Sequence, residues 1–352
     1  MKLVLLALGL LFVGIIFLLG WCGYPWSLNG RITKPEIVHL EPEGPINVEE
    51  LPTVIKIQTW NLGFLFGEGS QGPGYVQQSK KFYEDKMNNL VSEIKNSEPD
   101  IICLQEVDFD SHRSFNINQA QYLATKAGYP YVAEAVSWDA NYIPFPYWPL
   151  SRNFGHMKSG GAILSKFPII ANEVQLFQKP LSQPWWYNIF YLHRYMQEVQ
   201  IDLGERKIKI VNLHLESFDK EDRKSQISLL VSRIKEHKIN IISGDFNMVP
   251  PSAQKKRKFK NYEADDYEND GSYEEMLKSE LLEVIPDTIY ALDEMRYFTF
   301  PSSKPDRRLD YIFYDKGLKM IKAEVLPSAL SDHLPLKASF QIAVPKFNPY
   351  SQ

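Results

Sequence analysis

Polar residues capable of catalysis stand at the ends of several short apolar segments in this chain. The apolar segments alternate with amphipathic ones, and each polar residue follows an apolar segment directly or within a few positions. This group consists of Asn61, Glu106, His214, Asp245 and Asn247. Because ligands of open α/β sheets gather outside the carboxyl ends of the strands, we expect these side chains to converge on one site.

Three further candidates lie late in the chain. Asp310 falls in an apolar stretch, where an unpaired carboxylate would be costly, so it should have a polar partner. Asp332 and His333 are adjacent to each other. Taken singly, an Asp or Asn at a strand end is most often a turn former or a helix cap. Many such positions in one chain favour a shared functional site instead.

The residue types suit metal-assisted acid–base chemistry. Glu106 offers hard carboxylate oxygens of the kind that Mg²⁺ prefers, together with water and substrate oxygens. His214 and His333 suit proton transfer or contact with a phosphoryl oxygen. Asn61 and Asn247 can orient oxygens without adding charge. The chain has no His-x-x-His or Cys cluster typical of zinc, and no serine-hydrolase elbow, Walker loop or dinucleotide fingerprint.

Strands and helices alternate from residue 54 almost to the end of the chain. Strands are expected at 54–60, 101–105, 161–165, 198–203, 207–213, 239–243, 309–314, 320–325 and 336–342, and helices at 80–96, 224–237 and 272–284. Because nothing like a linker interrupts this alternation, the sequence predicts one α/β domain over residues 54–343 and a tail at 344–352.

The amino-terminal segment is long and apolar enough to cross a membrane. Lys2 is the only charged residue among residues 1–30, and about 20 apolar residues suffice to span a bilayer. A cleaved signal would end in small residues, whereas this run ends in GWCGYPW at residues 20–26. We therefore expect a single-pass anchor over 1–30 and a linker over 31–53. Lys2 favours a cytoplasmic amino terminus, with the domain extracytoplasmic, or secreted if the segment is cleaved.

Composition excludes several classes of protein. The 352 residues include 39 Lys and Arg against 43 Asp and Glu, a formal charge of −4, and 44% are hydrophobic. Such a balance is not that of a disordered chain, and the charge argues against a protein that coats nucleic acid non-specifically. Two cysteines are too few for a disulfide framework.

Seven short motifs together resemble the endonuclease/exonuclease/phosphatase superfamily, whose fold is DNase I-like. In chain order they are Thr59-Trp60-Asn61, Leu104-Gln105-Glu106-Val107, Gly160-Gly161-Ala162-Ile163-Leu164-Ser165-Lys166, Asn212-Leu213-His214-Leu215-Glu216, Gly244-Asp245-Phe246-Asn247, Arg308-Leu309-Asp310-Tyr311-Ile312 and Ser331-Asp332-His333-Leu334-Pro335. The resemblance covers about residues 54–343. It implies a four-layered α/β/β/α sandwich, here preceded by one N-terminal transmembrane helix, with the site at one edge of the sheets.

The resemblance also implies a divalent metal ion and hydrolysis of a phosphoester by a metal-oriented water. Glu106 would bind the ion, which would be Mg²⁺ or alternatively Mn²⁺. Asn61 would lie beside Glu106 in the metal and phosphate environment as a further metal-site residue, and Asp332 would complete the metal or surrounding network.

The remaining residues would carry out the reaction. Asp245 would align or deprotonate the attacking water, and Asn247 would hold that water or a phosphate oxygen. His214 would contact the phosphate on its leaving-group side. His333, oriented by Asp310, would act as base or as phosphate ligand. The identity of the general base and the number of metal ions stay open.

Two aromatic-rich segments, residues 138–154 and 184–195, bear on the substrate. With Arg152 and Arg194 they suit a membrane interface or a choline-like headgroup, which favours a sphingomyelinase-like phospholipid phosphodiesterase. They could equally pack on themselves, or stack on bases as in a membrane-anchored or secreted nuclease. A phosphatase and a non-catalytic binding protein of the same fold are further alternatives. The expected partners are the phosphoester substrate, lipid or nucleic acid, and the membrane; no obligate protein partner is expected.

Overall fold

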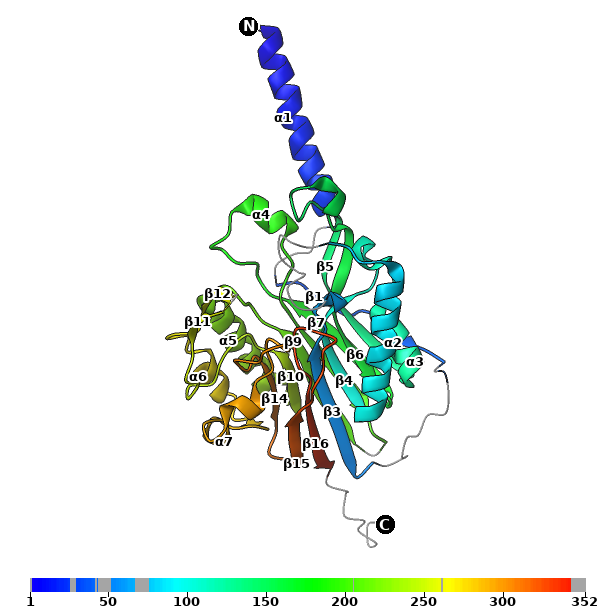
Figure 1. The fold of residues 1–352 in the computed structure, drawn as a ribbon, viewed down its shortest axis with the longest axis vertical. Helices are drawn as coiled ribbons and strands as arrows, with labels where there is room; N and C mark the ends of the chain where they lie inside the picture. Colours follow the sequence, from blue (N-terminus) through cyan, green and yellow to red (C-terminus); the bar gives the residue numbers. More distant parts are fainter. Residues whose placement is uncertain are drawn as a thin grey trace.

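The computed structural model describes residues 2–25, 30–41, 43, 52–66, 76–204, 206–260 and 262–342. The expected tail at 344–352 and much of the expected linker lie outside the described residues. Two seven-stranded sheets stack face to face, and helices cover their outer faces (Figure 1). This is the predicted α/β/β/α arrangement.

One sheet carries three of the predicted site residues, which are His214, Asp245 and Asp310. Its strands are, in spatial order, β1 (Ile32–Thr33), β7 (Ile169–Leu176), β8 (Tyr195–Asp202), β9 (Lys207–His214), β10 (Ile241–Asp245), β14 (Asp310–Tyr314) and β13 (Leu282–Glu283). Only β9 and β10 run parallel to each other, because α5 (Lys220–His237) connects them as a crossover helix. The other neighbouring strands in this sheet are antiparallel.

The other sheet carries the predicted site residues Asn61 and Glu106. Its strands are, in spatial order, β15 (Leu318–Val325), β16 (Leu336–Ile342), β3 (Val54–Asn61), β4 (Ile101–Asp108), β6 (Gly155–Ser165), β5 (Tyr131–Ile143) and β2 (Ile37–His39). Its parallel pair is β3 and β4, again joined by a crossover helix, α2 (Lys80–Ser97). A small separate hairpin is formed by β11 (Arg257–Phe259) and β12 (Tyr262–Asp266).

The crossover helices form where the apolar spacing predicts them. Ser79 accepts a hydrogen bond from the Phe82 backbone at 3.2 Å and caps α2, and Asp219 caps α5 in the same way. One face of each helix is buried against its sheet. Shorter helices are α3 (Gln119–Ala127), α4 (Trp185–Phe190), α6 (Ser272–Leu277) and α7 (Asp287–Tyr290), with 3₁₀ turns η1 (Gly63–Leu65), η2 (His112–Ser114), η3 (Leu150–Arg152) and η4 (Glu294–Tyr297).

The structure differs from the sequence expectation in several places. The helix expected over 272–284 ends at Leu277, because the next apolar residues pair with β14 as β13. Strands β5, β7, β11 and β12 and helices α3, α4 and α7 were not expected. Part of the segment expected to be a linker adds β1 to the edge of one sheet and β2 to the edge of the other. Strands of two or three residues carry too little pattern to be recognised before their partners are known.

The amino-terminal helix α1 (Lys2–Gly23) projects from one end of the domain (Figure 1). Its length and apolar composition suffice to cross a membrane, and they would also suit a signal sequence. The carboxyl end of α1 contacts β5 and α4. Asn141 of β5 donates from its backbone to the Tyr24 carbonyl at 2.7 Å and from its side chain to the Trp21 carbonyl at 3.1 Å.

A buried polar network joins the two sheets beneath the site. Asn212 on β9 donates to the Leu104 carbonyl of β4 at 2.9 Å and accepts from Gln105 at 2.6 Å. Gln105 also donates to Thr59 on β3 at 3.1 Å. All of these side chains are fully buried. Because buried polar groups are costly when unpaired, the network fixes which residues of the two sheets face each other.

Replacing Asn212 should therefore destabilise the whole domain. In Asn212→Leu the side chain of Gln105 and the Leu104 carbonyl lose a buried partner, so we expect the free energy of unfolding to fall by about 2–4 kcal/mol. Urea unfolding of the detergent-solubilised full chain, followed by circular dichroism, measures this. The control is Lys209→Ala on the same strand, whose partly exposed ion pair with Glu198 should contribute less than about 1 kcal/mol. Equal stability of both variants would contradict a structural role for the network.

Candidate active site

Strand register brings the predicted residues of one sheet side by side. In the pairing of β9, β10 and β14, Asp245 lies directly between His214 and Asp310. Asn247 follows two residues later in a left-handed conformation, with φ of 49°, and its backbone donates to Asp245 Oδ1 at 2.9 Å. The sharp turn after β10 therefore keeps Asn247 next to the carboxylate that ends the strand.

The other sheet contributes Asn61 and Glu106. Asn61 ends β3, and its side-chain nitrogen donates to Asp245 Oδ2 at 3.0 Å and to Glu106 Oε1 at 3.3 Å. Its oxygen accepts from the Gly63 backbone at 2.9 Å. In this orientation Asn61 presents a donor, not a metal-ligating oxygen, to the site, and it holds together carboxylates from two different sheets.

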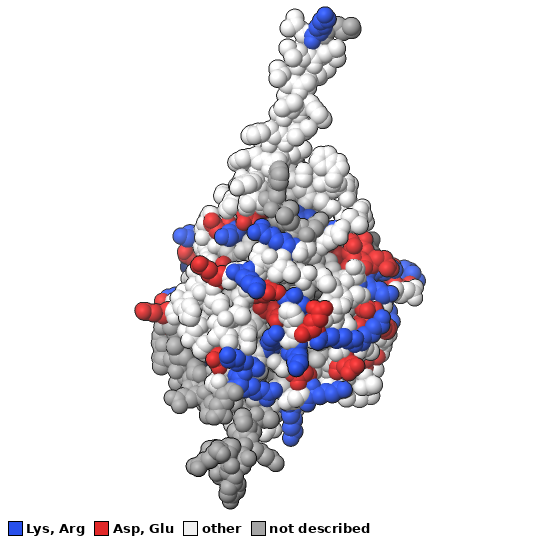
Figure 2. Space-filling view, turned by 180° about the vertical axis from the view of Figure 1, so that it is seen from behind, with Lys and Arg blue, Asp and Glu red and all other residues white. Residues whose placement is uncertain are grey.

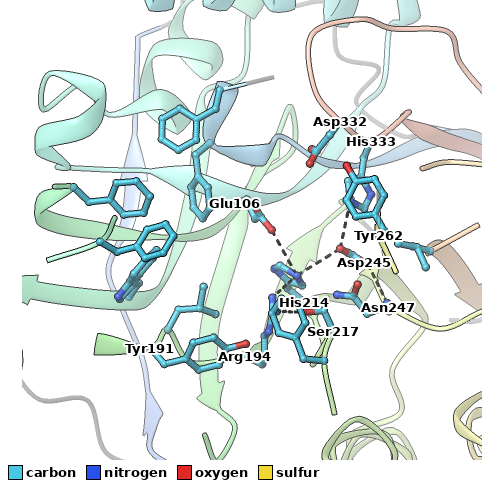
Figure 3. Close-up of a pocket in the computed structure, with 18 of the residues that line it drawn as sticks. Glu106, Tyr191, Arg194, His214, Ser217, Asp245, Asn247, Tyr262, Asp332 and His333 are labelled. Atoms are coloured by element: carbon cyan, nitrogen blue, oxygen red, sulfur yellow. Dashed lines mark hydrogen bonds and ion pairs between the residues drawn. The ribbon is translucent and has the colours of Figure 1, made fainter. Parts of the chain in front are cut away.

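The backbone at Glu106 departs from regular strand geometry. The pairing of β4 with β6 shifts register between Leu104 and Val107, and Glu106 has a φ of 53°. Such bulges re-aim a side chain, and a left-handed non-glycine residue persists only where its surroundings enforce it. The bulge turns the Glu106 carboxylate toward His214, whose Nε2 lies 3.8 Å from Glu106 Oε1 (Figure 3).

His333 and Asp310 form the buried pair that the sequence predicted for Asp310. His333 Nδ1 lies 2.8 Å from Asp310 Oδ2, and His333 Nε2 faces Asp245 Oδ2 at 3.8 Å. Trp60 donates to the His333 carbonyl at 2.9 Å, and the Phe300 ring packs against the imidazole with centroids 4.7 Å apart. The imidazole is therefore fixed, with Nε2 directed into the site.

Arg194 is buried in the wall of the site and is not exposed at its mouth. Its side chain is only 6% exposed, and its Nη1 lies 2.5 Å from His214 Nε2. It also donates to Ser217 at 2.7 Å and faces Glu216 at 3.6 Å. Because a guanidinium can only donate, His214 Nε2 accepts this hydrogen bond and the imidazole is neutral.

The charge states follow from burial and from these contacts. Burial raises the pKa of Asp245 to about 7, against the opposing charge of His333. Burial lowers the pKa of His333, but Asp310 and Asp245 outweigh it and raise the value to about 10. Burial and the adjacent Arg194 hold the pKa of His214 well below its usual range. At neutral pH the site thus contains one protonated and one neutral imidazole.

Two carboxylates suit a hard divalent cation. The two are Glu106 and Asp332. Burial raises the pKa of Glu106, and the negative charge of Asp332 raises it further, so a cation near both would relieve the repulsion between them. Within the described residues, no three or more His, Cys, Asp or Glu side chains form a group that could hold a metal ion. The pair fits an ion such as Mg²⁺, which takes one or two carboxylates and completes its shell with water and substrate oxygens.

These groups form one end of a cavity of about 550 Å³. Figure 3 shows Glu106, His214, Asp245 and His333 directed toward one another, with Arg194 and Tyr191 on the neighbouring wall. The rest of the lining is mainly aromatic, with side chains from both aromatic-rich segments; they include Trp138, Phe145, Tyr147, Phe154, Tyr187, Phe190 and Tyr191. Arg152 lies outside the lining, exposed on η3.

Sequence reasoning missed several lining residues. Tyr262, Asp265 and Phe300 belong to the β11–β12 hairpin and to the chain before β14. Arg307 holds them in place, since its guanidinium stacks on Tyr262 and Phe300 and binds Asp265 at 2.7 Å. Nothing in the local sequence distinguishes them. For the wall around Arg194 the sequence did offer a signal, which is Glu216 in the His214 motif. In the structure its carboxylate lies 3.6 Å from the Arg194 guanidinium.

Solved structures share this fold. A protein of the endonuclease/exonuclease/phosphatase type from Beutenbergia cavernae matches at 17% identity with a TM-score of 0.56, over 83% of this chain and 72% of that one. The human Nocturnin catalytic domain with bound sulfate matches at 20% identity and 0.52, over 88% and 97%. A mannosyl-6-phosphatase from Bacteroides thetaiotaomicron matches at 16% and 0.53, over 81% and 99%. No curated protein sequence gives a significant match.

The family model agrees with the motifs and the fold. The model described as the endonuclease/exonuclease/phosphatase family matches residues 59–333, a range that includes every site residue considered above. Members of this family are hydrolases that act on phosphoesters. The chain is a member of the endonuclease/exonuclease/phosphatase family.

Proposed function

We propose that this protein is a Mg²⁺-dependent phosphodiesterase that hydrolyses the headgroup ester of a membrane phospholipid. The observation that carries this proposal is the two-sided cavity. Its floor holds the carboxylates and imidazoles, whereas its walls are largely aromatic. A site for a small sugar phosphate needs no such apolar wall, but an amphiphile with a phosphodiester would use both parts.

Glu106 and Asp332 would hold the metal ion, with Asn61 donating to Glu106 to orient it. A bound Mg²⁺ would supply charge that polarises the phosphoryl group and stabilises the negative charge that develops on it. Mn²⁺ would serve in the same way. The remaining steps belong to the protein side chains.

Asp245 would accept a proton from the attacking water, since burial brings its pKa to about 7 and Asn61 and Asn247 orient its two oxygens. The water oxygen would bond to phosphorus as the P–O bond to the lipid alcohol breaks, and the leaving alkoxide would take up a proton from solvent water. Protonated His333, held by Asp310, would donate a hydrogen bond from Nε2 to a phosphoryl oxygen. Arg194 would contact the phosphate on the leaving-group side, and neutral His214, which accepts a hydrogen bond from Arg194, would hold the guanidinium in place.

The test is a substrate panel on the detergent-solubilised full chain with Mg²⁺. It includes a choline phospholipid, plasmid DNA and a sugar phosphate monoester, with Asp245→Asn as the inactive control. We expect hydrolysis of the phospholipid and release of its phosphorylated headgroup. Cleavage of DNA alone would establish the nuclease alternative, and cleavage of the monoester alone a phosphatase. No hydrolysis of any substrate would identify a non-catalytic protein.

Removal of divalent metal should abolish the activity. Chelation by EDTA should stop hydrolysis, and added Mg²⁺ or Mn²⁺ should restore it. In Glu106→Gln the ion loses a charged ligand, so the Mg²⁺ concentration for half-maximal rate should rise at least about tenfold. Full activity in EDTA would contradict the proposed chemistry, and an unchanged Mg²⁺ requirement in Glu106→Gln would contradict the assigned ligand.

Asp310 should act through His333. In Asp310→Asn the imidazole loses the charge that fixes and protonates it, and kcat should fall by about 10²- to 10⁴-fold with little change in KM. The matched control is Asp293→Asn, which removes an exposed carboxylate outside the cavity lining and should leave both parameters unchanged. A purely structural role for Asp310 would instead lower the folded fraction while the folded enzyme kept its kcat.

A further inference from the structure

Large apolar side chains project into solvent from two segments at the mouth of the cavity. One is the loop after β5, and the other is the start of α4. We call these exposed residues the aromatic rim; they are Tyr147, Trp148, Leu150, Trp185 and Trp186. Trp148 is 79% exposed and Trp185 is 70% exposed. Exposed aromatic side chains grouped in this way mark an interaction surface more often than singly scattered ones do.

The segments that carry the rim also build the cavity. Phe145 and Tyr147 from the loop, and Tyr187 and Phe190 from α4, line its walls. Trp138 of β5 ties the two segments together, since its ring nitrogen donates to the Phe190 carbonyl at 2.9 Å. Whatever surface the rim contacts therefore lies directly against the mouth of the cavity.

The rim is continuous with the apolar helix. The carboxyl end of α1 contacts β5 and α4, and Figure 1 shows α4 and the loop after β5 at the level where α1 leaves the domain. Figure 2 shows uncharged surface that extends from α1 onto the adjoining end of the domain, with charged residues beginning further down. The hydrogen bonds from Asn141 to the carbonyls of Trp21 and Tyr24 hold α1 against β5.

The composition of the rim matches the interfacial zone of a bilayer. Tryptophan and tyrosine concentrate at the headgroup level, where an apolar ring and a polar edge are both accommodated. Arg152 is exposed two residues beyond Leu150 on the same turn, and a cation in that place can reach lipid phosphates. A water-exposed rim of this composition beside an apolar helix would otherwise be a liability for aggregation.

We propose that the aromatic rim lies in the interfacial layer of the bilayer that α1 enters, and that it holds the mouth of the cavity against the lipid surface. This inference rests on the proposed function, since it describes how the same cavity would reach its substrate. The partner is the lipid surface itself; a second protein seated on the rim is the competing outcome of the test.

The position of the rim can be measured without any catalysis. The full chain is reconstituted into phosphatidylcholine vesicles containing a doxyl-labelled lipid, with a cysteine-linked NBD fluorophore at Trp148→Cys or Trp185→Cys. The native cysteines Cys22 and Cys103 are both buried, so the label goes to the introduced residue. The control is Leu292→Cys, also highly exposed but just after α7, which lies far from α1 in Figure 1.

We expect the doxyl lipid to quench the label at 148 and 185 and to leave the label at 292 unquenched. Labels at 148 and 185 that are as water-exposed as the label at 292 would overturn the inference. Labels shielded from water in the same vesicles but not quenched by the lipid would overturn it in favour of a protein contact.

A second measurement separates the rim from the chemistry. In Trp148→Ser/Trp185→Ser, hydrolysis of phospholipid in vesicles should fall about tenfold, the equivalent of about 1.4 kcal/mol of interfacial contact. Hydrolysis of bis(p-nitrophenyl) phosphate, which needs no membrane, should be unchanged because neither tryptophan lines the cavity. An equal loss on both substrates would contradict the interfacial role. Quenching of the labels in a protein that hydrolyses no lipid would leave the rim established and refute the proposed function instead.

Discussion

Desolvation of charge at the meeting point of the two sheets is the constraint on which the rest of this structure depends. Asp245, Asp310 and His333 are all nearly inaccessible to water, and each buried ion costs several kcal/mol unless neighbouring groups compensate it. The compensation is reciprocal. Asp310 stabilises the charge on His333, and the charge on His333 in turn limits the rise in the pKa of Asp245. Removing one member therefore leaves an uncompensated charge, so the cluster must form as a whole.

That cluster forms only if the sheets meet in one register. Asn61 must reach Asp245 from the opposite sheet, and a shift of one residue in a strand would turn its side chain to the other face. The buried network of Asn212, Gln105 and Thr59 lies next to the site and prevents such a shift, because any other register would leave buried amides unpaired. The polar interior between the sheets thus specifies the position of the candidate catalytic groups as well as stabilising the fold.

The sequence could predict the residues of the site better than their contacts. Asn61, Glu106, His214 and Asp245 were recognised because they follow apolar strands, and Asp310 was expected to have a partner because an isolated buried carboxylate is unfavourable. Local pattern does not encode a contact such as that between Ser331 and the Asn61 carbonyl, 270 residues apart, which depends on the packing of the completed fold. For the same reason the contact between Arg194 and His214 could not be foreseen, although Arg194 itself was named as a substrate-binding candidate and lines the cavity. The bulge at Glu106 was equally invisible, since it arises from pairing with β6.

The aromatic segments show how one stretch of sequence can serve two environments. Phe145 and Phe190 face the cavity, whereas Trp148 and Trp185, a few residues away, face solvent. Packing alone would favour burial of all four rings, and burying a large aromatic side chain is among the larger favourable contributions to folding. Leaving the tryptophans exposed is therefore a cost to the isolated domain that only an outside apolar phase can recover. If the rim lies in a bilayer as proposed, its position beside α1 would give the cavity wall and the membrane surface a common boundary.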